Sequence, residues 1–497
     1  MGNEKTAIII GAGIGGITTA IFLAKNGYKV SVYEKNATPG GRCGQMIRDG
    51  HRFDLGATIY LMPEVYRKVF QSLGISPEES FESVPLTTLY TVYFDDGAQI
   101  AFTTDKDKLK EQLEDLEKGS FEKSQVLQKE GYQLFQLAMD RLIGRNFYHL
   151  FDFITLKNAL LLLKLKTHIR HVTYIRRFFR HQHLQTAFTF QNIYVGQNPY
   201  TAPALFSMIP AAELTEGSLF PVGGMFSVTR KLVSMAENLG VRFSYDQPVI
   251  KIKTENKRAA GIVLQNGSII RASVIVANAD LPYVYRELLP EKSISRRIDK
   301  LKYSCSAIVL HWGLDKMYPE LGHHSVFLSG DYRANLDKIF KEQSLSENPS
   351  FYIHAPVRSD LTAAPAGHDT LSVVIPAGHL DERRDQNWNE LKNKARTAVI
   401  NRLKEQGIAD IEEHIKFEIC YLPQTWESLF NLSKGATFGS LGHNIFQMGY
   451  FRPHNKHNRY RNLYFTGGST HPGNGIPLVL LSAQLTSERI IKENQHE

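Results

Sequence analysis

The chain has 497 residues, of which 42% are hydrophobic and 22% are charged. This composition excludes a disordered or fibrous protein, and the length predicts two domains, each with its own core. The formal net charge of +8 suits anionic lipid or nucleic acid, but the basic residues form no groove-reading motif, so we expect no nucleic-acid partner.

The three cysteines, Cys43, Cys305 and Cys420, have neither zinc-ligand spacing nor the even count of a disulfide framework. We therefore expect no metal site and a reducing, cytoplasmic location. The first residues lead straight into a strand pattern without the layout of a signal peptide, and no stretch has 18 consecutive apolar residues. The sequence predicts a protein that is soluble or attached peripherally to a membrane.

The first 34 residues predict a strand, a tight turn, a helix and a second strand that ends at Glu34. The turn is the glycine-rich run Gly11, Ala12, Gly13, Ile14, Gly15 and Gly16. Glycines there allow the turn, admit a pyrophosphate near the backbone and let the helix pack on the strand. A carboxylate at Glu34 accepts hydrogen bonds from ribose hydroxyls, which favours FAD or NAD over NADP, although this motif does not separate the first two.

A second glycine pair, Gly40 and Gly41, follows closely and is succeeded by Arg42. The glycines bring backbone near phosphate, and the guanidinium pairs with it. The segment resembles the second signature of the glutathione-reductase-like flavoproteins, which favours FAD. An ordinary polar turn is the alternative interpretation.

The segment 141–183 mixes Lys, Arg and His with bulky apolar residues. It has the composition of an interfacial membrane anchor, with cations at the headgroups and aromatic rings in the lipid. A solvated helical cap is the alternative. The rings that we expect to enter lipid are Phe147, Phe151, Phe153, Phe178 and Phe179.

Further along the chain, aromatic and apolar residues provide material for a hydrophobic tunnel, although each of them also suits an ordinary core position. The candidates for the tunnel wall are Phe188, Phe190, Tyr194, Tyr200, Phe206 and Met208.

The C-terminal segment 462–491 predicts a strand over 463–466, a turn at Gly467 and Gly468, and a helix from Pro477 onward. Gly475 and the first turn of that helix offer backbone N–H groups and the positive end of a helix dipole. Such donors stabilise the negative charge that a flavin acquires when it accepts hydride.

Several segments together resemble the bacterial carotenoid desaturase family, which includes phytoene and diapophytoene (dehydrosqualene) desaturases. The resemblance covers most of the chain, and two segments are more similar to the diapophytoene type. Ala57 and Asn474 depart from the family pattern. The segments that carry the resemblance are 50–70, 190–210, 219–232, 450–460 and 470–479.

The resemblance implies a Rossmann-like FAD-binding domain, a discontinuous α+β substrate domain and a helical cap that faces a membrane. We assign 1–75, 225–285 and 455–497 to the first domain and 76–224 and 286–454 to the second. Besides the two glycine-rich motifs, Glu34 and Arg42, the FAD-site residues implied are Lys35, Thr58, Val249, Gly467, Gly468, Gly475, Ile476 and Pro477.

The expected activity is desaturation of an apolar polyene by hydride transfer to flavin N5, with reoxidation by oxygen or a quinone. His471 and Glu213 are the candidate acid–base residues, although either side chain also suits a structural role. A related carotenoid oxygenase, isomerase or saturase, an FAD amine oxidase, and a non-enzymatic prenyl-binding protein are the alternatives. The expected location is the inner face of the cell membrane.

Overall fold

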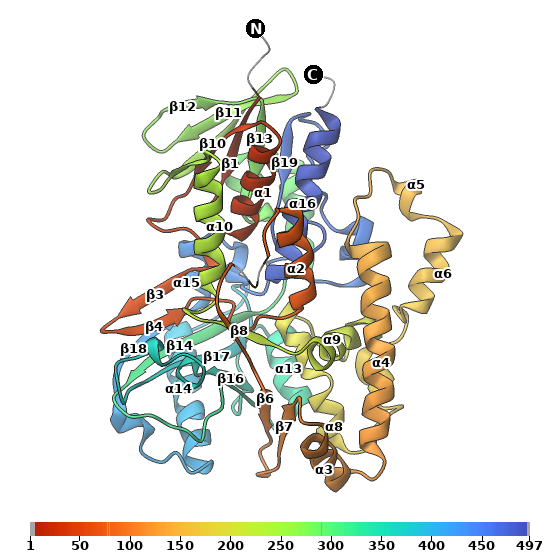
Figure 1. Ribbon diagram of the computed structural model, residues 1–497, viewed down its shortest axis with the longest axis vertical. Helices are drawn as coiled ribbons and strands as arrows, with labels where there is room; N and C mark the ends of the chain where they lie inside the picture. The colour runs from red at the N-terminus through yellow and green to blue at the C-terminus, as the bar shows by residue number, and fades with distance from the viewer. Residues whose placement is uncertain (1–4, 77, 79, 290, 495–497) are drawn as a thin grey trace.

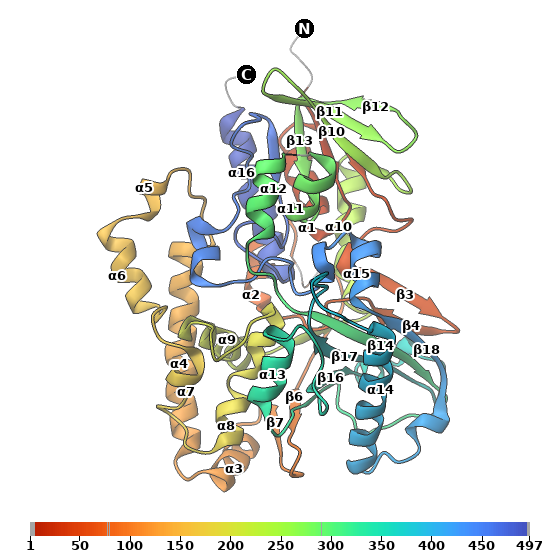
Figure 2. The same ribbon diagram turned by 180° about the vertical axis from the view of Figure 1, so that it is seen from behind.

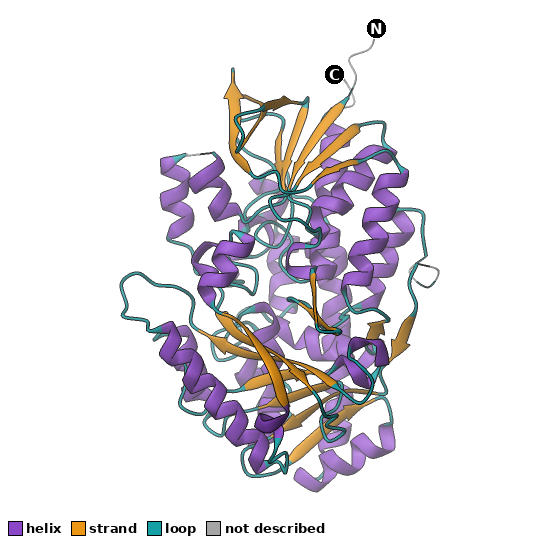
Figure 3. Ribbon diagram, turned by 90° about the vertical axis from the view of Figure 1, so that its left-hand side faces the viewer, coloured by secondary structure: helices purple, strands orange, loops and turns teal. Residues whose placement is uncertain are grey.

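The computed structural model describes residues 5–494 except 77, 79 and 290 (Figure 1). Two β-sheets lie at opposite ends of the molecule, with helices and loops between them (Figure 3). The N-terminal and C-terminal segments meet at one end, beside the first sheet (Figures 1 and 2).

The first sheet has five parallel strands in the order β19-β13-β1-β2-β9. Runs of β-branched and aliphatic residues form its central strands, as expected for a sheet that is covered on both faces. The strands are β1 (Thr6–Ile10), β2 (Lys29–Tyr33), β9 (Arg242–Ser244), β13 (Val274–Ala277) and β19 (Leu463–Phe465).

Helix α1 (Ile14–Lys25) contacts both α10 (Phe226–Asn238) and α16 (Ile476–Glu493), and α2 (Pro63–Ser72) packs on α16. Antiparallel strands β10 (Val249–Glu255), β11 (Arg258–Leu264) and β12 (Ile269–Arg271) form a smaller sheet beside this domain. Apolar residues from both chain ends therefore share one core, which includes Ile17, Leu232 and Leu480.

The second sheet has seven strands in the order β18-β14-β17-β16-β15-β6-β7, and only the β15–β6 pair is parallel among the described residues. Every residue of β14, which lies between β18 and β17, is buried. The strands are β6 (Thr88–Tyr93), β7 (Gln99–Thr103), β14 (Ser306–Leu314), β15 (His324–Phe327), β16 (Phe351–His354), β17 (Asp369–Ala377) and β18 (Ile415–Tyr421).

A helical region projects at one edge, with α5 and α6 at its margin (Figures 1 and 2). It comprises α3 (Lys106–Leu116), α4 (Ser120–Ala138), α5 (Leu150–Phe153), α6 (Leu156–Lys164), α7 (His171–Ile175), α8 (Gln182–Ala187) and α9 (Met208–Glu216). The remaining α-helices are α11 (Leu281–Tyr283), α12 (Lys292–Asp299), α13 (Tyr332–Phe340), α14 (Trp388–Glu405) and α15 (Pro423–Phe430). Two short antiparallel pairs are β3 (Gln45–Arg48) with β4 (His51–Asp54), and β5 (Ser83–Pro85) with β8 (Leu219–Pro221).

The predicted fold class, a Rossmann-like α/β domain combined with an α+β domain, is confirmed. The parallel sheet draws its strands from 6–33, 242–277 and 463–465, and the seven-stranded sheet from 88–103 and 306–421. Both sets fall within the segments assigned to the two domains, although the boundaries themselves stay a prediction. Within the part of the chain that the structure describes, no helix is both long and apolar enough to cross a bilayer.

Candidate FAD and substrate site

One cavity of about 530 Å³ extends from the edge of the parallel sheet to the face of the seven-stranded sheet. At one end it is lined by Gly11 and Glu34, which follow β1 and β2. At the other end it is lined by Val326 of β15 and Ile339 of α13. The carboxyl ends of parallel strands are where open α/β sheets bind nucleotides, and this cavity begins there.

The glycine-rich turn packs tightly on Asn278, which follows β13. Gly11 has φ of +95°, and a Cβ on it would lie 2.6 Å from the carbonyl oxygen of Asn278. A Cβ on Gly16 would lie only 2.2 Å from the carbonyl oxygen of Gly11. Side chains at these positions would separate helix α1 from the sheet, so glycine is required at both. Asn278 was missed from sequence, because only the return of β13 to the sheet places it here.

Glu34 is buried at the end of β2, where it receives two backbone hydrogen bonds. The N–H of Ala12 donates to its Oε2 at 2.7 Å, and the N–H of Asn36 donates to its Oε1 at 2.9 Å. Each carboxylate oxygen retains a further lone pair for a ribose hydroxyl. The turn and the acid therefore hold each other in position at the nucleotide end of the cavity.

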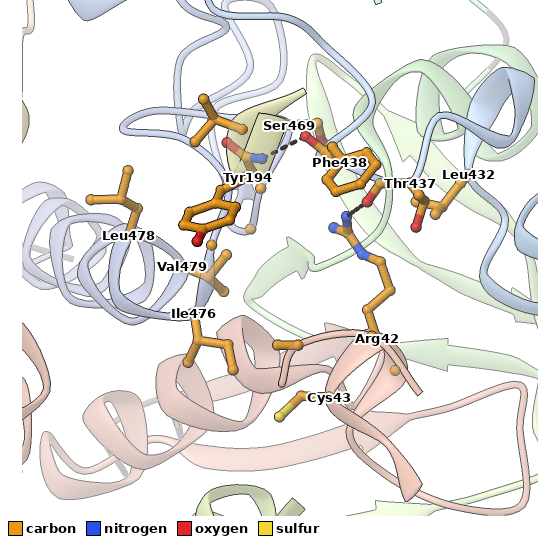
Figure 4. A pocket seen from close by; sticks show the side chains of 18 of the residues that line it. Arg42, Cys43, Tyr194, Leu432, Thr437, Phe438, Ser469, Ile476, Leu478 and Val479 are labelled. Carbon is orange, nitrogen blue, oxygen red and sulfur yellow. Dashed lines mark hydrogen bonds between the residues drawn. The ribbon is translucent and has the colours of Figure 1, made fainter. Parts of the chain in front are cut away.

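Arg42 connects the N-terminal motif with two distant segments. Its Nη1 donates to the carbonyl of Thr437 at 2.9 Å (Figure 4), and a Cβ on Gly468 would lie 3.2 Å from its Nη2. Burial lowers the pKa of Arg42, and the nearby Asp280 carboxylate opposes that shift. The guanidinium thus stays cationic beside the cavity, as phosphate binding requires.

The C-terminal loop 467–475 lines the cavity next to the first glycine-rich turn, since a Cβ on Gly15 would lie 3.0 Å from Val479, just after the loop. Helix α16 begins at Ile476, one residue earlier than predicted, and Gly475 precedes it with φ of +89°. Figure 4 shows Ile476 and Val479 across the cavity from Arg42. The free N–H groups of the first turn of α16 are available to an electron-rich ring.

Arg452, which the sequence analysis did not single out, holds this loop from behind. It is 1% exposed, its Nε donates to the carbonyl of Thr470 at 2.9 Å, and its Nη2 donates to the carbonyl of Gly468 at 2.5 Å. Its Nη1 donates to the carbonyls of Gly442 and Gln447. Burial lowers the pKa of Arg452. The available sequence signal was an arginine at the start of a run rich in His and Asn, whose burial the sequence does not show.

Most of the residues that the sequence analysis assigned to the FAD site line this one cavity. They are Gly11, Gly13, Ile14, Gly15, Glu34, Lys35, Gly40, Gly41, Arg42, Thr58, Val249, Gly467, Gly468, Gly475, Ile476 and Pro477. Ala12 and Gly16 lie behind the wall, where the first bonds Glu34 and the second packs on Gly11. Their contribution is to shape the turn.

The geometry fits a flavin dinucleotide. Glycines that a Cβ would crowd or strain line the cavity in the N-terminal turn and in the C-terminal loop, and the guanidinium of Arg42 lies close to that loop at Gly468. The buried Thr466 Oγ1 and Asn474 Oδ1 have no hydrogen-bond partner within the described chain, although both residues line the cavity. Buried polar atoms in such positions call for a polar ligand.

The two candidate acid–base residues differ in position. His471 lines the cavity and its Nε2 donates to the carbonyl of Arg145 at 3.0 Å. Burial lowers the pKa of His471 to about 4, so the imidazole is neutral near pH 7. Glu213 lies one layer behind the wall, bonded by Tyr90 and Tyr194, and burial raises its pKa to about 8. Their assignment as acid–base residues stays a prediction.

The predicted tunnel wall is partly wrong. Phe190, Tyr194, Phe206 and Met208 line the cavity. Phe188 is instead packed between Phe102 and Phe179 in the core, and Tyr200 lies under the guanidinium of Arg333. The wall also includes aliphatic residues from β15 and α13 that sequence alone did not bring to this place.

The predicted set of lipid-facing aromatic residues is also wrong for four of its five members. Phe147, Phe153 and Phe179 are buried and Phe178 is half-buried. The first two pack in the core beside α5, and the last two follow α7 and pack in another core cluster. Only Phe151, at 83% exposed, faces outward. Other apolar side chains are also exposed on and beside α5 and α6 and in the segment 445–451. Together with Phe151 we call them the apolar patch, comprising Phe151, Ile154, Leu156, Leu160, Leu163, Phe446 and Phe451.

The spacing of the three cysteines predicts no metal site, but it says nothing about histidines. The structure brings together three buried histidines, His323, His324 and His354, whose ligand atoms lie within 4.8 Å of one another. Their proximity depends on the pairing of β15 with β16, which the sequence does not specify.

The fold and this cavity define a flavin-dependent oxidoreductase. Residues 14–491 match the family of flavin containing amine oxidoreductases, and the chain belongs to this family, with FAD as its cofactor.

Individual relatives within the comparison carry more specific names than the family. The chain is 38% identical over 489 residues to a zeta-carotene-forming phytoene desaturase from Myxococcus xanthus, covering 98% of this chain and 94% of that protein. It is 32% identical over 495 residues to a 4,4'-diapophytoene desaturase (4,4'-diaponeurosporene-forming) from Staphylococcus aureus, covering 98% of each. A crystal structure of an oxidoreductase from Methanosarcina mazei matches with a TM-score of 0.65 at 16% identity, covering 97% of this chain and 100% of that chain.

Proposed function

We propose that the protein is an FAD-dependent desaturase of an acyclic carotenoid precursor, either phytoene or diapophytoene. The relatives named for these two activities match nearly the whole chain. The observation that carries the proposal is that one cavity contains both kinds of lining. The glycine-rich motifs line the part that fits FAD, and mainly apolar side chains line the rest, which we call the apolar arm. The aliphatic part of that arm includes Ile193, Leu205, Val326, Leu328, Leu336 and Ile339.

A polyene substrate offers no charge and no hydrogen-bonding group, so binding depends on shape and on exclusion of water. The apolar arm supplies both. Bound FAD supplies the hydride acceptor. The aromatic rings of Phe190, Tyr194 and Phe206 line the same cavity and stabilise positive charge that develops on a conjugated chain.

Acid–base chemistry has a small part in this proposal. The neutral imidazole of His471 is the candidate to accept a proton at the cavity wall, with solvent as the other acceptor. Burial raises the pKa of Glu213 to about 8, and the side chain lies behind the cavity wall, so in this proposal it supports Tyr194 by a hydrogen bond. Oxygen or a quinone is the proposed terminal electron acceptor.

We also propose that the protein docks peripherally on the inner face of the cell membrane through the apolar patch. Exposed apolar groupings of this kind mark interaction surfaces, and exposed Lys157 and Lys164 flank it on α6. The patch residues of 151–163 and those of 446–451 are adjacent, since Phe153 of α5 contacts Phe451 with ring centroids 5.5 Å apart. Met448 and Gly449 line the cavity within the same 445–451 segment, which supports entry of a lipid-dissolved substrate beside the patch.

The activity is tested by coexpression with a phytoene synthase and, separately, with a diapophytoene synthase, followed by pigment spectra and mass spectrometry. Loss of hydrogen pairs and a shift from colourless to yellow or orange is the expected result. Unchanged mass would indicate an isomerase, a gain of hydrogen a saturase, and a gain of oxygen an oxygenase. Flavin-loaded protein that leaves both precursors unchanged, with oxygen or with a quinone, would refute the proposal.

A further inference from the structure

Three buried histidines lie together on the seven-stranded sheet, outside the wall of the FAD cavity. His324 of β15 and His354 of β16 are directly paired across the two antiparallel strands. His323 precedes β15, and its ring centroid lies 4.4 Å from that of His324 and 5.0 Å from that of His354. The exposed fractions are 7% for His323, 3% for His324 and 1% for His354.

The hydrogen bonds of these rings leave several nitrogens without a partner. The Nδ1 of His323 lies 2.8 Å from the hydroxyl of Ser359, and the Nδ1 of His324 lies 2.7 Å from the hydroxyl of Tyr352. The Nε2 of His323 and both ring nitrogens of His354 have no partner within the described chain. Burying several such atoms together is unfavourable, and a shared ligand removes that cost.

We propose that His323, His324 and His354 bind one divalent transition-metal ion, with Zn²⁺ as the favoured ion. Imidazole nitrogens suit zinc and its neighbours, whereas Mg²⁺ and Ca²⁺ prefer oxygen ligands that this cluster does not offer. Nitrogen ligands about 2.1 Å from a tetrahedral zinc lie roughly 3.4 Å apart. The ligand atoms, all within 4.8 Å of one another, reach that spacing by small rotations of the rings.

The protonation and orientation of the rings favour binding. Burial lowers the pKa of all three histidines, so each ring is neutral, as a metal ligand must be. The hydroxyl contacts at Nδ1 of His323 and His324 orient those rings, as supporting hydrogen bonds do in metal sites. Arg358 and Arg52 lie nearby and oppose a cation, but Arg358 is paired with Asp369 and Arg52 with Asp360.

The site connects to the FAD cavity through one side chain. The Tyr352 hydroxyl contacts both His324 Nδ1 and, at 2.9 Å, the Oγ1 of Thr58. Tyr352 and Thr58 both line the cavity. A metal ion here therefore joins β15 to β16 and fixes the wall behind Thr58, without contacting the substrate.

The test uses untagged, FAD-loaded protein that is treated with a chelator and then given ZnCl₂ or CoCl₂. We expect about one equivalent of metal per chain after desalting, by elemental mass spectrometry, and the visible bands of tetrahedral Co²⁺. Zinc should also raise the melting temperature, because it binds the folded chain preferentially. Folded wild-type protein that retains FAD but holds neither ion at micromolar concentration would overturn the proposal.

Variants identify the ligands. His354→Gln and His323→Gln should abolish the bound equivalent, and Ser359→Ala should weaken binding roughly tenfold by freeing the ring of His323. His171→Gln is the matched control, since His171 is equally buried and lies outside the cluster. Metal that binds His354→Gln and His323→Gln as tightly as the wild type would assign the ion to another place. If these two variants do not fold, Ser359→Ala and the Co²⁺ spectrum of the wild type still decide the question.

Discussion

Arg42 donates a hydrogen bond to the carbonyl of Thr437, and this contact joins two positions 395 residues apart. The same guanidinium lies close to Gly468, so the N-terminal glycine pair and the C-terminal loop meet at one cation. Neither the N-terminal motif nor the C-terminal loop encloses FAD alone. A cofactor that contacts both therefore requires that the two segments be held together.

Gly11→Ala should remove most of the bound FAD. Alanine at φ of +95° is strained, and its Cβ would lie 2.6 Å from the carbonyl oxygen of Asn278. The strain alone costs on the order of 1–3 kcal/mol, and the clash adds to it. The measurement is the flavin-to-protein absorbance ratio after gel filtration, together with the melting temperature.

Gly27→Ala is the matched control for this prediction. Gly27 also has positive φ, at +81°, but nothing lies within 4 Å of its Cβ position. It should lose stability through strain alone and retain FAD. Equal FAD loss in both variants would show that crowding at Asn278 is irrelevant to the cofactor.

Arg452→Met should loosen the loop 467–475. The change removes the donors to the carbonyls of Thr470 and Gly468, which leaves buried carbonyl oxygens unpaired and costs roughly 1–3 kcal/mol. We expect a lower melting temperature and a shift of the flavin absorption bands, because the start of α16 follows this loop. An unchanged flavin spectrum in a folded Arg452→Met protein would show that Arg452 does not position the loop.

The parts of the site that could be predicted are those formed by elements that follow one another in the sequence. The turn at Gly11 and the acid at Glu34 follow from a strand, a helix and a second strand that are consecutive in sequence. Phe151 and Phe153 lie only two positions apart, yet one is exposed and the other buried, because the phase of the short helix α5 decides the matter. The pairing of His324 with His354 depends on strand register across a long connection. Composition does not encode that register.

Glu213 should make stability depend on pH. Below pH 4.5, its ordinary pKa, the carboxyl is protonated in both folded and unfolded chains. Between 4.5 and about 8 the unfolded chain ionises while the folded chain keeps its proton, so unfolding releases a proton. The contribution to stability is therefore lost as pH rises through this window, by at most about 1.4 kcal/mol per pH unit.

Glu213→Gln keeps the shape and cannot ionise, so its melting temperature should fall less than that of the wild type between pH 5 and pH 8. Glu111→Gln, at an exposed position, is the control and should follow the wild type. Parallel wild-type and Glu213→Gln curves across this range would mean that the buried carboxyl does not titrate as described.

The apolar patch predicts the effect of polar substitutions on membrane binding. Phe151, Leu156 and Leu160 are 83%, 79% and 59% exposed, so replacing all three by serine leaves the packed core intact. Each apolar side chain that enters the interface contributes roughly 1 kcal/mol or more, so the triple variant should bind anionic liposomes about a hundredfold more weakly in flotation. Leu361→Ser, at an equally exposed leucine outside the patch, should bind as the wild type does. If the triple variant floats as well as Leu361→Ser, the docking surface lies elsewhere; if the wild type itself stays in the soluble fraction, the protein does not dock on anionic membranes at all.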